Sequence, residues 1–154
     1  MRSGTVNVAA AASLAKALRL SQEKVEDVKI KHKEFKTMIV DGFSEYNHIV
    51  INSPLSEKYI DSIINISLPK IKGEAIVNAL NERGIMVSTT SACSSKTFHL
   101  NEALFARGLS RENIEGSIRV SFSNETTKEE VETFIEVFID EYNKKFKEVI
   151  ESGI

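Results

Sequence analysis

The sequence SIRVSFSNETTKEEVETFIEVFIDEYNKKFKEV, residues 117–149, decides the fold of this chain. Its first six residues alternate polar and apolar side chains, and this period of two predicts a β-strand with one buried face. Thr127 and Glu130 have the spacing of a capping box, in which each side chain accepts a hydrogen bond from the other residue's backbone amide. Apolar residues then follow at helical spacing and predict a long helix packed on a sheet: Val131, Phe134, Ile135, Phe138, Ile139, Tyr142, Phe146 and Val149.

Short strands and helices alternate in the residues that precede this stretch. Three further strands are predicted where β-branched and apolar residues cluster, at residues 48–51, 63–68 and 85–88. Two short helices are predicted at residues 73–83, with Gly84 as the C-cap, and at residues 100–106. Residues 89–97 are mostly small or hydroxyl-bearing and lack a hydrophobic period, which predicts a flexible loop. The pattern predicts a small α+β domain over residues 45–154, with an antiparallel sheet covered by helices.

The first 44 residues carry helical patterns and no strand. Residues 6–20 are Ala-rich and predict a buried or interface helix. Ser21 is the expected N-cap of a second helix that runs to about Val40, with Gly42 as its stop. We therefore expect residues 1–44 to be two linking helices that pack on another, larger domain.

The composition excludes several classes of function. The chain has 154 residues, 42% of them hydrophobic, and its 20 basic and 22 acidic residues give a net charge of −2. This balance offers no electrostatic reason to expect nucleic-acid binding. No apolar run approaches the ~20 residues that span a bilayer, so we expect no membrane segment. The single cysteine predicts a reducing, cytoplasmic location, and three scattered histidines do not make a metal site.

Cys93 is a candidate nucleophile because small polar residues surround it, whereas structural cysteines usually lie among apolar neighbours. Lys96 would favour the thiolate, which an unperturbed thiol with a pKa of ~8.5 forms only weakly at neutral pH. Composition alone leaves a reactive cysteine and an incidental surface thiol equally open. A cysteine protease would need a histidine and a further polar partner, and His99 reads equally well as a surface histidine.

Arg119 stands between two apolar residues of the predicted strand, so alternation places it on the opposite face. It is either a solvent-facing arginine or a guanidinium that binds a carboxylate in bidentate fashion, a contact worth ~1.5–3 kcal/mol. Gly4 and Thr5 form a glycine–hydroxyl pair of a kind that can contact phosphate, or they belong to a frayed end.

Four motifs, taken together, resemble those of the cysteine desulfurases, which are fold-type I pyridoxal-phosphate enzymes related to the class V aminotransferases. They are Arg2-Ser3-Gly4-Thr5-Val6-Asn7, Ser91-Ala92-Cys93-Ser94-Ser95, Ser117-Ile118-Arg119-Val120-Ser121-Phe122 and Thr126-Thr127-Lys128-Glu129-Glu130. The matching subgroup has a long cysteine loop and serves iron–sulfur cluster assembly and tRNA thiolation. The resemblance covers essentially the whole chain and implies the C-terminal domain of such an enzyme.

The resemblance implies a role for each candidate residue. Cys93 would attack the sulfur of L-cysteine held on pyridoxal phosphate, which forms a persulfide and leaves alanine. The long loop would carry the persulfide to an acceptor, an iron–sulfur scaffold or a tRNA-thiolation enzyme. Arg119 would bind the substrate carboxylate. Gly4 and Thr5 would contact the cofactor phosphate of the partner subunit in a homodimer, and His99 matches no catalytic position.

The chain also departs from the family pattern. The family's Schiff-base lysine and the histidine and aspartate that hold the cofactor ring lie in a large domain that precedes the Arg2 motif. We therefore expect the isolated chain to be inactive. Thr89 and Thr90 stand where glycine-containing turns are usual.

Two other classes of function stay open. A related pyridoxal-phosphate enzyme, such as a selenocysteine lyase or an aminotransferase, would use the same fold, and an aminotransferase would not need Cys93. A non-catalytic interaction module would instead use the apolar face of residues 6–20 to bind a partner chain.

Overall fold

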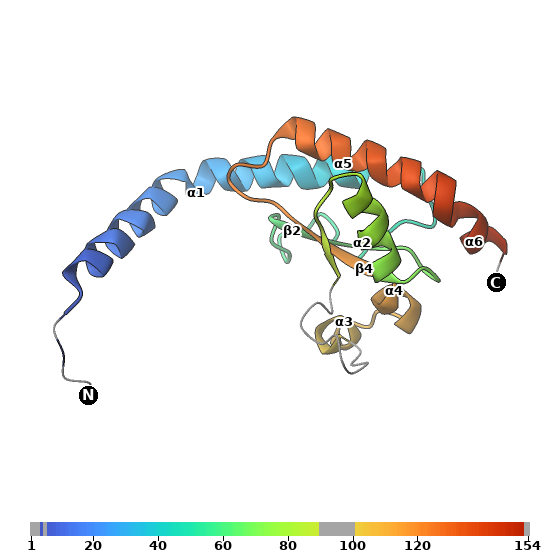
Figure 1. The fold of residues 1–154 in the computed structure, drawn as a ribbon, viewed down its shortest axis with the longest axis horizontal. Coiled ribbons are helices and arrows are strands. Elements are labelled where there is room, and N and C mark those ends of the chain that lie inside the picture. Colours follow the sequence, from blue (N-terminus) through green and yellow to red (C-terminus); the bar gives the residue numbers. More distant parts are fainter. Residues whose placement is uncertain (1–3, 5, 90–100, 153–154) are drawn as a thin grey trace.

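A computed structural model describes residues 4, 6–89 and 101–152 of the chain. Within these residues, one four-stranded antiparallel sheet has the strand order β1-β2-β4-β3. Its two central strands, β2 and β4, are labelled in Figure 1. The strands are β1 (Val50–Ile51), β2 (Ile63–Ser67), β3 (Ser88–Thr89) and β4 (Ser117–Ser121). The helices are α1 (Val8–Gly42), α2 (Gly73–Glu82), α3 (Glu102–Ala106), α4 (Arg111–Glu115), α5 (Lys128–Glu141), the π-helical turn η1 (Tyr142–Phe146) and α6 (Lys147–Ser152). The sheet and its helices confirm the predicted α+β class.

The register of β2 against β4 divides the sheet into an apolar face and a polar face. Ile64 pairs with Val120 and Ile66 pairs with Ile118. These four side chains belong to the buried core beneath α1 and α5. Because side chains alternate along a strand, the intervening residues point to the other face: Asn65 and Ser67 on β2, and Ser117, Arg119 and Ser121 on β4.

The predicted long helix is confirmed. Thr127 is the N-cap of α5, and the reciprocal capping box with Glu130 is present. The apolar stripe continues through η1 into α6, and its buried members belong to the core. Its predicted last member is wrong: Val149 is 43% exposed and Ile150 is buried instead, because the wider π-helical turn of η1 shifts the helical register. Phe43, just after α1, packs against Phe138 with the ring centroids 4.9 Å apart, which joins the ends of the two long helices.

The two predicted N-terminal helices are one continuous helix, so that part of the prediction is wrong. Asn7 is the N-cap of α1, and its side chain accepts a hydrogen bond from the Ala10 amide at 3.0 Å. Ser21 lies inside the helix. No glycine or proline interrupts residues 8–41, and a serine in a helix interior costs well under ~1 kcal/mol. The residues on either side of it also pair one turn apart, with Arg19 and Glu23 3.6 Å from each other.

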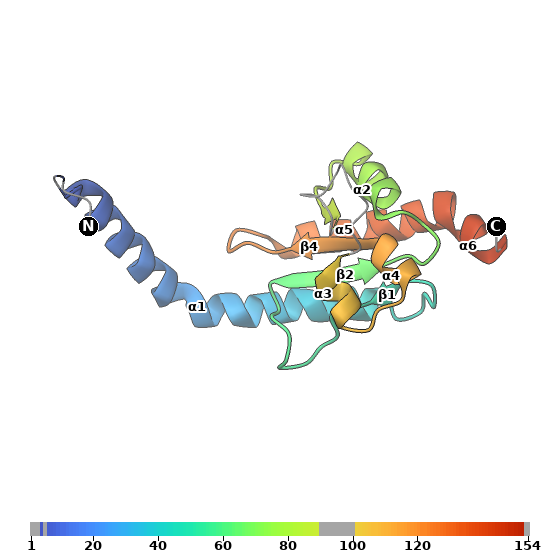
Figure 2. The same ribbon diagram turned by 90° about the horizontal axis from the view of Figure 1, so that it is seen from below.

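The two halves of α1 have different surroundings. The second half packs on the sheet beside α5, and its buried residues are His32, Phe35, Lys36 and Ile39. The first half projects beyond the rest of the fold (Figures 1 and 2). There Val8 is 71% exposed and Leu14 is 62% exposed. These side chains are not buried within the described part of this chain. The prediction for residues 6–20 was a helix that is either buried or at an interface, and only the interface alternative agrees with this exposure.

The smaller elements agree with the predictions except at their ends. The strand predicted at 85–88 is β3, Ser88–Thr89, and the helix predicted at 100–106 is α3, capped by the Asn101 side chain. The C-cap of α2 is Arg83, and Gly84 follows it with a positive φ of 79°. Most of the predicted loop lies outside the described residues. No helix in the described part of the chain is long and apolar enough to cross a membrane.

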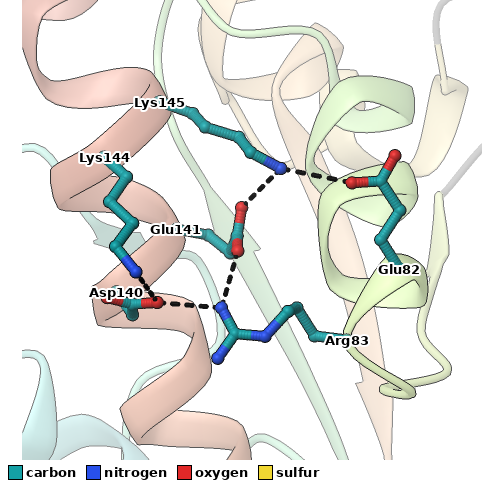
Figure 3. Close-up of polar contacts among 6 residues, drawn as sticks. All are labelled: Glu82, Arg83, Asp140, Glu141, Lys144 and Lys145. Carbon is teal, nitrogen blue, oxygen red and sulfur yellow. Dashed lines mark hydrogen bonds and ion pairs between the residues drawn. The ribbon is translucent and has the colours of Figure 1, made fainter.

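A cluster of charged residues joins the end of α2 to the end of α5 (Figure 3). Arg83 Nη1 donates to Asp140 Oδ2 at 2.8 Å and to Glu141 Oε1 at 2.9 Å. Lys145 Nζ lies 2.8 Å from Glu141 Oε2, an ion pair whose angles fall outside hydrogen-bond geometry. The side chain of Glu141 is 5% exposed. Lys145 contributes most to lowering the pKa of the Glu141 carboxyl group, and Arg83 lowers it further, against the opposing effect of burial.

The lowered pKa of Glu141 makes stability depend on pH. Its ionised form stabilises the fold fully above the unfolded-state pKa of about 4.3, and this contribution is lost as the pH falls through the lower folded-state value. We expect Glu141→Gln to reduce the free energy of unfolding at neutral pH by about 1–3 kcal/mol, and to weaken the loss of stability that acid causes. Urea unfolding at neutral and acid pH measures both effects. Glu136→Gln, at an exposed position of α5, is the control, and equal losses in the two variants would contradict the prediction.

Candidate functional site

Arg119 lies at the centre of the polar face of the sheet. Its Cα pairs with Asn65 on β2 and with Ser88 on β3. Its side chain is exposed. Among the described residues, no hydrogen bond or ion pair engages its guanidinium group. A rigid strand therefore presents an arginine that has its donors available for a ligand.

Buried asparagines support the strand that carries Arg119. Asn52 Nδ2 donates to Asn65 Oδ1 and to Ser67 Oγ, both at 2.6 Å. Asn65 Nδ2 donates to the carbonyl oxygen of Ile118 at 3.0 Å, next to Arg119 in the chain. We call Asn52, Asn65 and Ser67 the asparagine network. Both amide hydrogens of Asn52 have partners, as expected for buried polar groups, so the network holds β2 and β4 in one arrangement.

Arg107 contacts the asparagine network from outside. Arg107 Nη2 donates to the carbonyl oxygen of Asn52 at 2.9 Å and to the Tyr59 hydroxyl at 2.6 Å. The guanidinium carbon of Arg107 lies 4.6 Å from the centre of the Tyr59 ring. Arg107 follows α3, so these contacts attach α3 to the loop between β1 and β2.

The structure describes only some of the predicted site residues. Cys93, Thr5 and His99 lie outside the described residues, and so does Lys96. Gly4 is described and exposed, and a Cβ placed on it would meet no heavy atom within 4 Å. It lies before α1, whose first half projects away from the sheet in Figure 1.

Gly4 is the one residue of the predicted cofactor-phosphate site that the structure describes. Its exposed backbone, with open space where a Cβ would stand, leaves room for a phosphate to approach. Within residues 4, 6–89 and 101–152, no group of three or more His, Cys, Asp or Glu side chains is placed to hold a metal ion.

A hollow of about 490 Å³ lies elsewhere, between the start of α5, the end of β4 and residues 84–87. Ile39, Val120 and Phe134 of the apolar core line it, and Arg119 does not. The hollow therefore belongs to the helix-covered side of the sheet, away from the polar face.

Sequence reasoning missed the asparagine network and Arg107. A polar residue in the middle of the apolar strand Ile63-Ile64-Asn65-Ile66 was an available signal for Asn65. Asn52 stands directly before Ser53 and Pro54, a sequence typical of a turn, which gave no sign of a buried asparagine. No local pattern in the sequence pointed to the role of Arg107, because its partners Asn52 and Tyr59 lie about fifty positions away.

Comparisons with known proteins agree with this architecture. Residues 1–134 match the aminotransferase class-V family. The chain belongs to that family. Within it, the chain is 33% identical to a NifS/IcsS protein homolog of Lactobacillus delbrueckii subsp. bulgaricus over 99% of its own length. It is 32% identical to the cysteine desulfurase IscS of Photobacterium profundum over 86% of its length.

The solved structures that resemble this chain are also NifS-like proteins. A NifS-like protein matches 92% of this chain with a TM-score of 0.76 and 27% identity, and the NifS-like protein of Rickettsia africae matches with a TM-score of 0.75. The resemblance to cysteine desulfurases is confirmed. The chain spans 40% of the Lactobacillus protein, 32% of the Photobacterium protein and 35% of the first NifS-like chain.

Substitution of Asn65 should reduce the stability of the fold, whereas substitution of Arg119 should leave it almost unchanged. Asn65→Ala removes one of the two acceptors of the Asn52 amide and the donor to the Ile118 carbonyl oxygen, so we expect the free energy of unfolding to fall by about 1–3 kcal/mol. Arg119→Gln removes no contact with the described residues, so we expect a change within about 0.5 kcal/mol. Urea unfolding of both variants tests the pair. A loss on Arg119→Gln as large as that on Asn65→Ala would mean that Arg119 is structural.

Proposed function

We propose that this chain forms the small domain of a pyridoxal-phosphate-dependent cysteine desulfurase, with Cys93 as the sulfur acceptor and Arg119 as the ligand of the substrate carboxylate. The observation that carries the proposal is the position of Arg119. No described residue pairs with its guanidinium group on the polar face, and its cross-strand neighbour Ser88 is on the strand that leads into the Cys93 segment.

The pairing of β3 with β4 limits how far Cys93 can be from Arg119. Ser88 is the cross-strand partner of Arg119. Cys93 follows Ser88 by five positions, and a fully extended chain covers at most about 18 Å over that length. A thiol on such a short tether is within reach of a small amino acid bound at Arg119.

Arg119 is suited to a carboxylate because a guanidinium group can donate two parallel hydrogen bonds to it. No acidic side chain of the described residues competes for this arginine. Its strand is held by the asparagine network, so binding does not require the backbone to be ordered first.

The proposed sulfur transfer begins with the Cys93 thiolate, since the thiolate is the reactive form. Its Sγ attacks the sulfur of bound L-cysteine. A sulfur–sulfur bond forms while the carbon–sulfur bond of the substrate breaks, and the electron pair left on carbon takes up a proton to give alanine. Pyridoxal phosphate, as the cofactor of the whole protein, would supply the electron sink that this bond cleavage needs. The Cys93 persulfide then passes its outer sulfur to an acceptor thiol.

The remaining parts of the proposal concern the rest of the protein. The second half of the predicted linker, residues 1–44, packs in this domain's own core through Phe35, Ile39 and Phe43. We propose that its first half links this domain to a large cofactor-binding domain, and the exposed apolar side chains of Val8, Leu14 and Leu18 support such an interface. Gly4 and Thr5 would contact the cofactor phosphate of the second subunit of a homodimer. An iron–sulfur scaffold or a tRNA-thiolation enzyme, in the cytoplasm, would receive the sulfur.

The test is alanine release from L-cysteine by the whole protein that carries this chain, with a reductant present. We expect Cys93→Ala to abolish alanine release and Arg119→Gln to raise KM for cysteine about ten- to a hundredfold, as loss of a charge-assisted contact of ~1.5–3 kcal/mol requires. Cys93→Ser is the matched control for side-chain size and should also be inactive.

Other outcomes point to the related enzymes. An unchanged rate after Cys93→Ala would favour an aminotransferase, and alanine release from selenocysteine alone would favour a selenocysteine lyase. Either result would overturn the desulfurase proposal.

A further inference from the structure

Asn52 is a buried asparagine that fixes the position of Asn65. It directly follows β1, and only 7% of the residue is exposed. Its backbone amide donates to the Asn65 carbonyl oxygen at 2.9 Å, and its Nδ2 donates to Asn65 Oδ1 at 2.6 Å. Arg107 holds Asn52 in turn, by a hydrogen bond to the Asn52 carbonyl oxygen. The backbone and the side chain of Asn65 are therefore both tied to one residue.

The hydrogen bonds of Asn65 also decide which way its amide group points. Its Oδ1 accepts from Asn52, while its Nδ2 donates to the Ile118 carbonyl oxygen at 3.0 Å. A reversed amide would place two donors opposite each other at Asn52 and two acceptors opposite each other at Ile118. Because these residues are buried, such a mismatch leaves polar groups without partners and out of water. Asn52 thus keeps the donor of Asn65 directed at Ile118.

The Ile118 carbonyl oxygen belongs to the same rigid peptide plane as the backbone nitrogen of Arg119. A hydrogen bond to this oxygen limits rotation of the plane, and with it the direction in which the Arg119 side chain leaves β4. The outer neighbour of β4, the strand β3, offers little restraint because it has only two residues. A binding group must be held within about 0.5 Å and 10–20° of its working position. The bond from Asn65 supplies such a restraint at the root of the arginine.

We propose that Asn52 is a positioning residue for carboxylate binding: through Asn65 it fixes the peptide at Arg119, and thereby the direction from which the guanidinium group donates. The inference rests on the proposed function of Arg119 and deepens it, by naming a residue that shapes the site without touching the substrate. A bidentate contact needs both of its hydrogen bonds aligned at once. A tilt of the backbone therefore weakens the contact even when the arginine itself is intact.

The test is a double-substitution cycle in the whole protein that carries this chain. Asn52→Leu roughly keeps the size of the side chain and removes its donors, and it is made both alone and together with Arg119→Gln. The values of kcat and KM for alanine release from L-cysteine are measured for each protein. Urea unfolding compares the stability of the variants, and hydrogen–deuterium exchange reports on the backbone of residues 118–122.

The matched control is Ser117→Ala. It removes the buried hydrogen bond from Ser117 Oγ to the Ile114 carbonyl oxygen, on the same strand as Arg119, and leaves the link between Asn52 and Asn65 intact. If Asn52→Leu does not fold, Asn52→Ala, which leaves room for a water molecule, takes its place in the same cycle.

We expect Asn52→Leu to raise KM for cysteine about tenfold, because the contact at Arg119 is misaligned and not removed. The value of kcat should stay within about twofold, since a contact made equally in the ground state and the transition state affects KM alone. In the Arg119→Gln background the same substitution should raise KM no further, because its effect passes through Arg119. Ser117→Ala should leave KM almost unchanged, and exchange at residues 118–122 should be faster in Asn52→Leu than in this control.

Two kinetic results would overturn the positioning role. One is an unchanged KM in Asn52→Leu, and the other is a rise in KM of equal size with and without Arg119→Gln, because Asn52 would then act on the fold as a whole. If the wild-type protein releases no alanine, the proposed function fails, and the exchange measurement decides the inference. Faster exchange in Asn52→Leu than in Ser117→Ala would support the tie between Asn52 and the Arg119 peptide, and equal exchange would overturn it.

Discussion

The antiparallel pairing of β2 with β4 is the constraint on which the rest of the structure depends. Five cross-strand pairs run from Ile63 with Ser121 to Ser67 with Ser117. A shift of one residue would exchange the two faces of β4 and place Arg119 in the core. Just before the paired residues of β4, the backbone of Gly116 lies so close to the carbonyl oxygen of Leu68 that a Cβ on Gly116 would overlap it. The one register thus decides both the packing of the helices and the position of the arginine.

The two faces of the sheet are held by different forces. On one face, isoleucine and valine side chains pack beneath α1 and α5, and burial of apolar area is non-directional. On the other face, Asn52, Asn65 and Ser67 make directional hydrogen bonds out of water. A lost partner there leaves a buried polar group unsatisfied. The polar face, which directional hydrogen bonds hold together, is therefore the face that can keep a side chain such as Arg119 in a defined place.

Two arginines near the polar face illustrate how environment decides role. Arg107 has its donors satisfied by Asn52 and Tyr59, so its charge serves to join α3 to the loop. Arg119 has no such partner among the described residues, so its donors remain available. The charged cluster at Glu141 is a third arrangement, in which Lys145 and Arg83 lower the pKa of a buried carboxyl group (Figure 3). It connects α2 to α5 and lies away from the candidate site.

The sequence by itself determined the local elements and the family. The capping box at Thr127, the apolar stripe of α5 and the alternation around Arg119 are short-range patterns, and short-range backbone physics is enough to produce them. The same patterns misplaced the break at Ser21, because the cost of a serine inside a helix is too small to end it. Only the tertiary structure decided that Arg119 has no side-chain partner among the described residues, that Asn52 meets Asn65, and that Arg107 meets Tyr59. Those contacts join residues distant in sequence, and no local periodicity encodes which side chains a sheet register and a packed loop bring together.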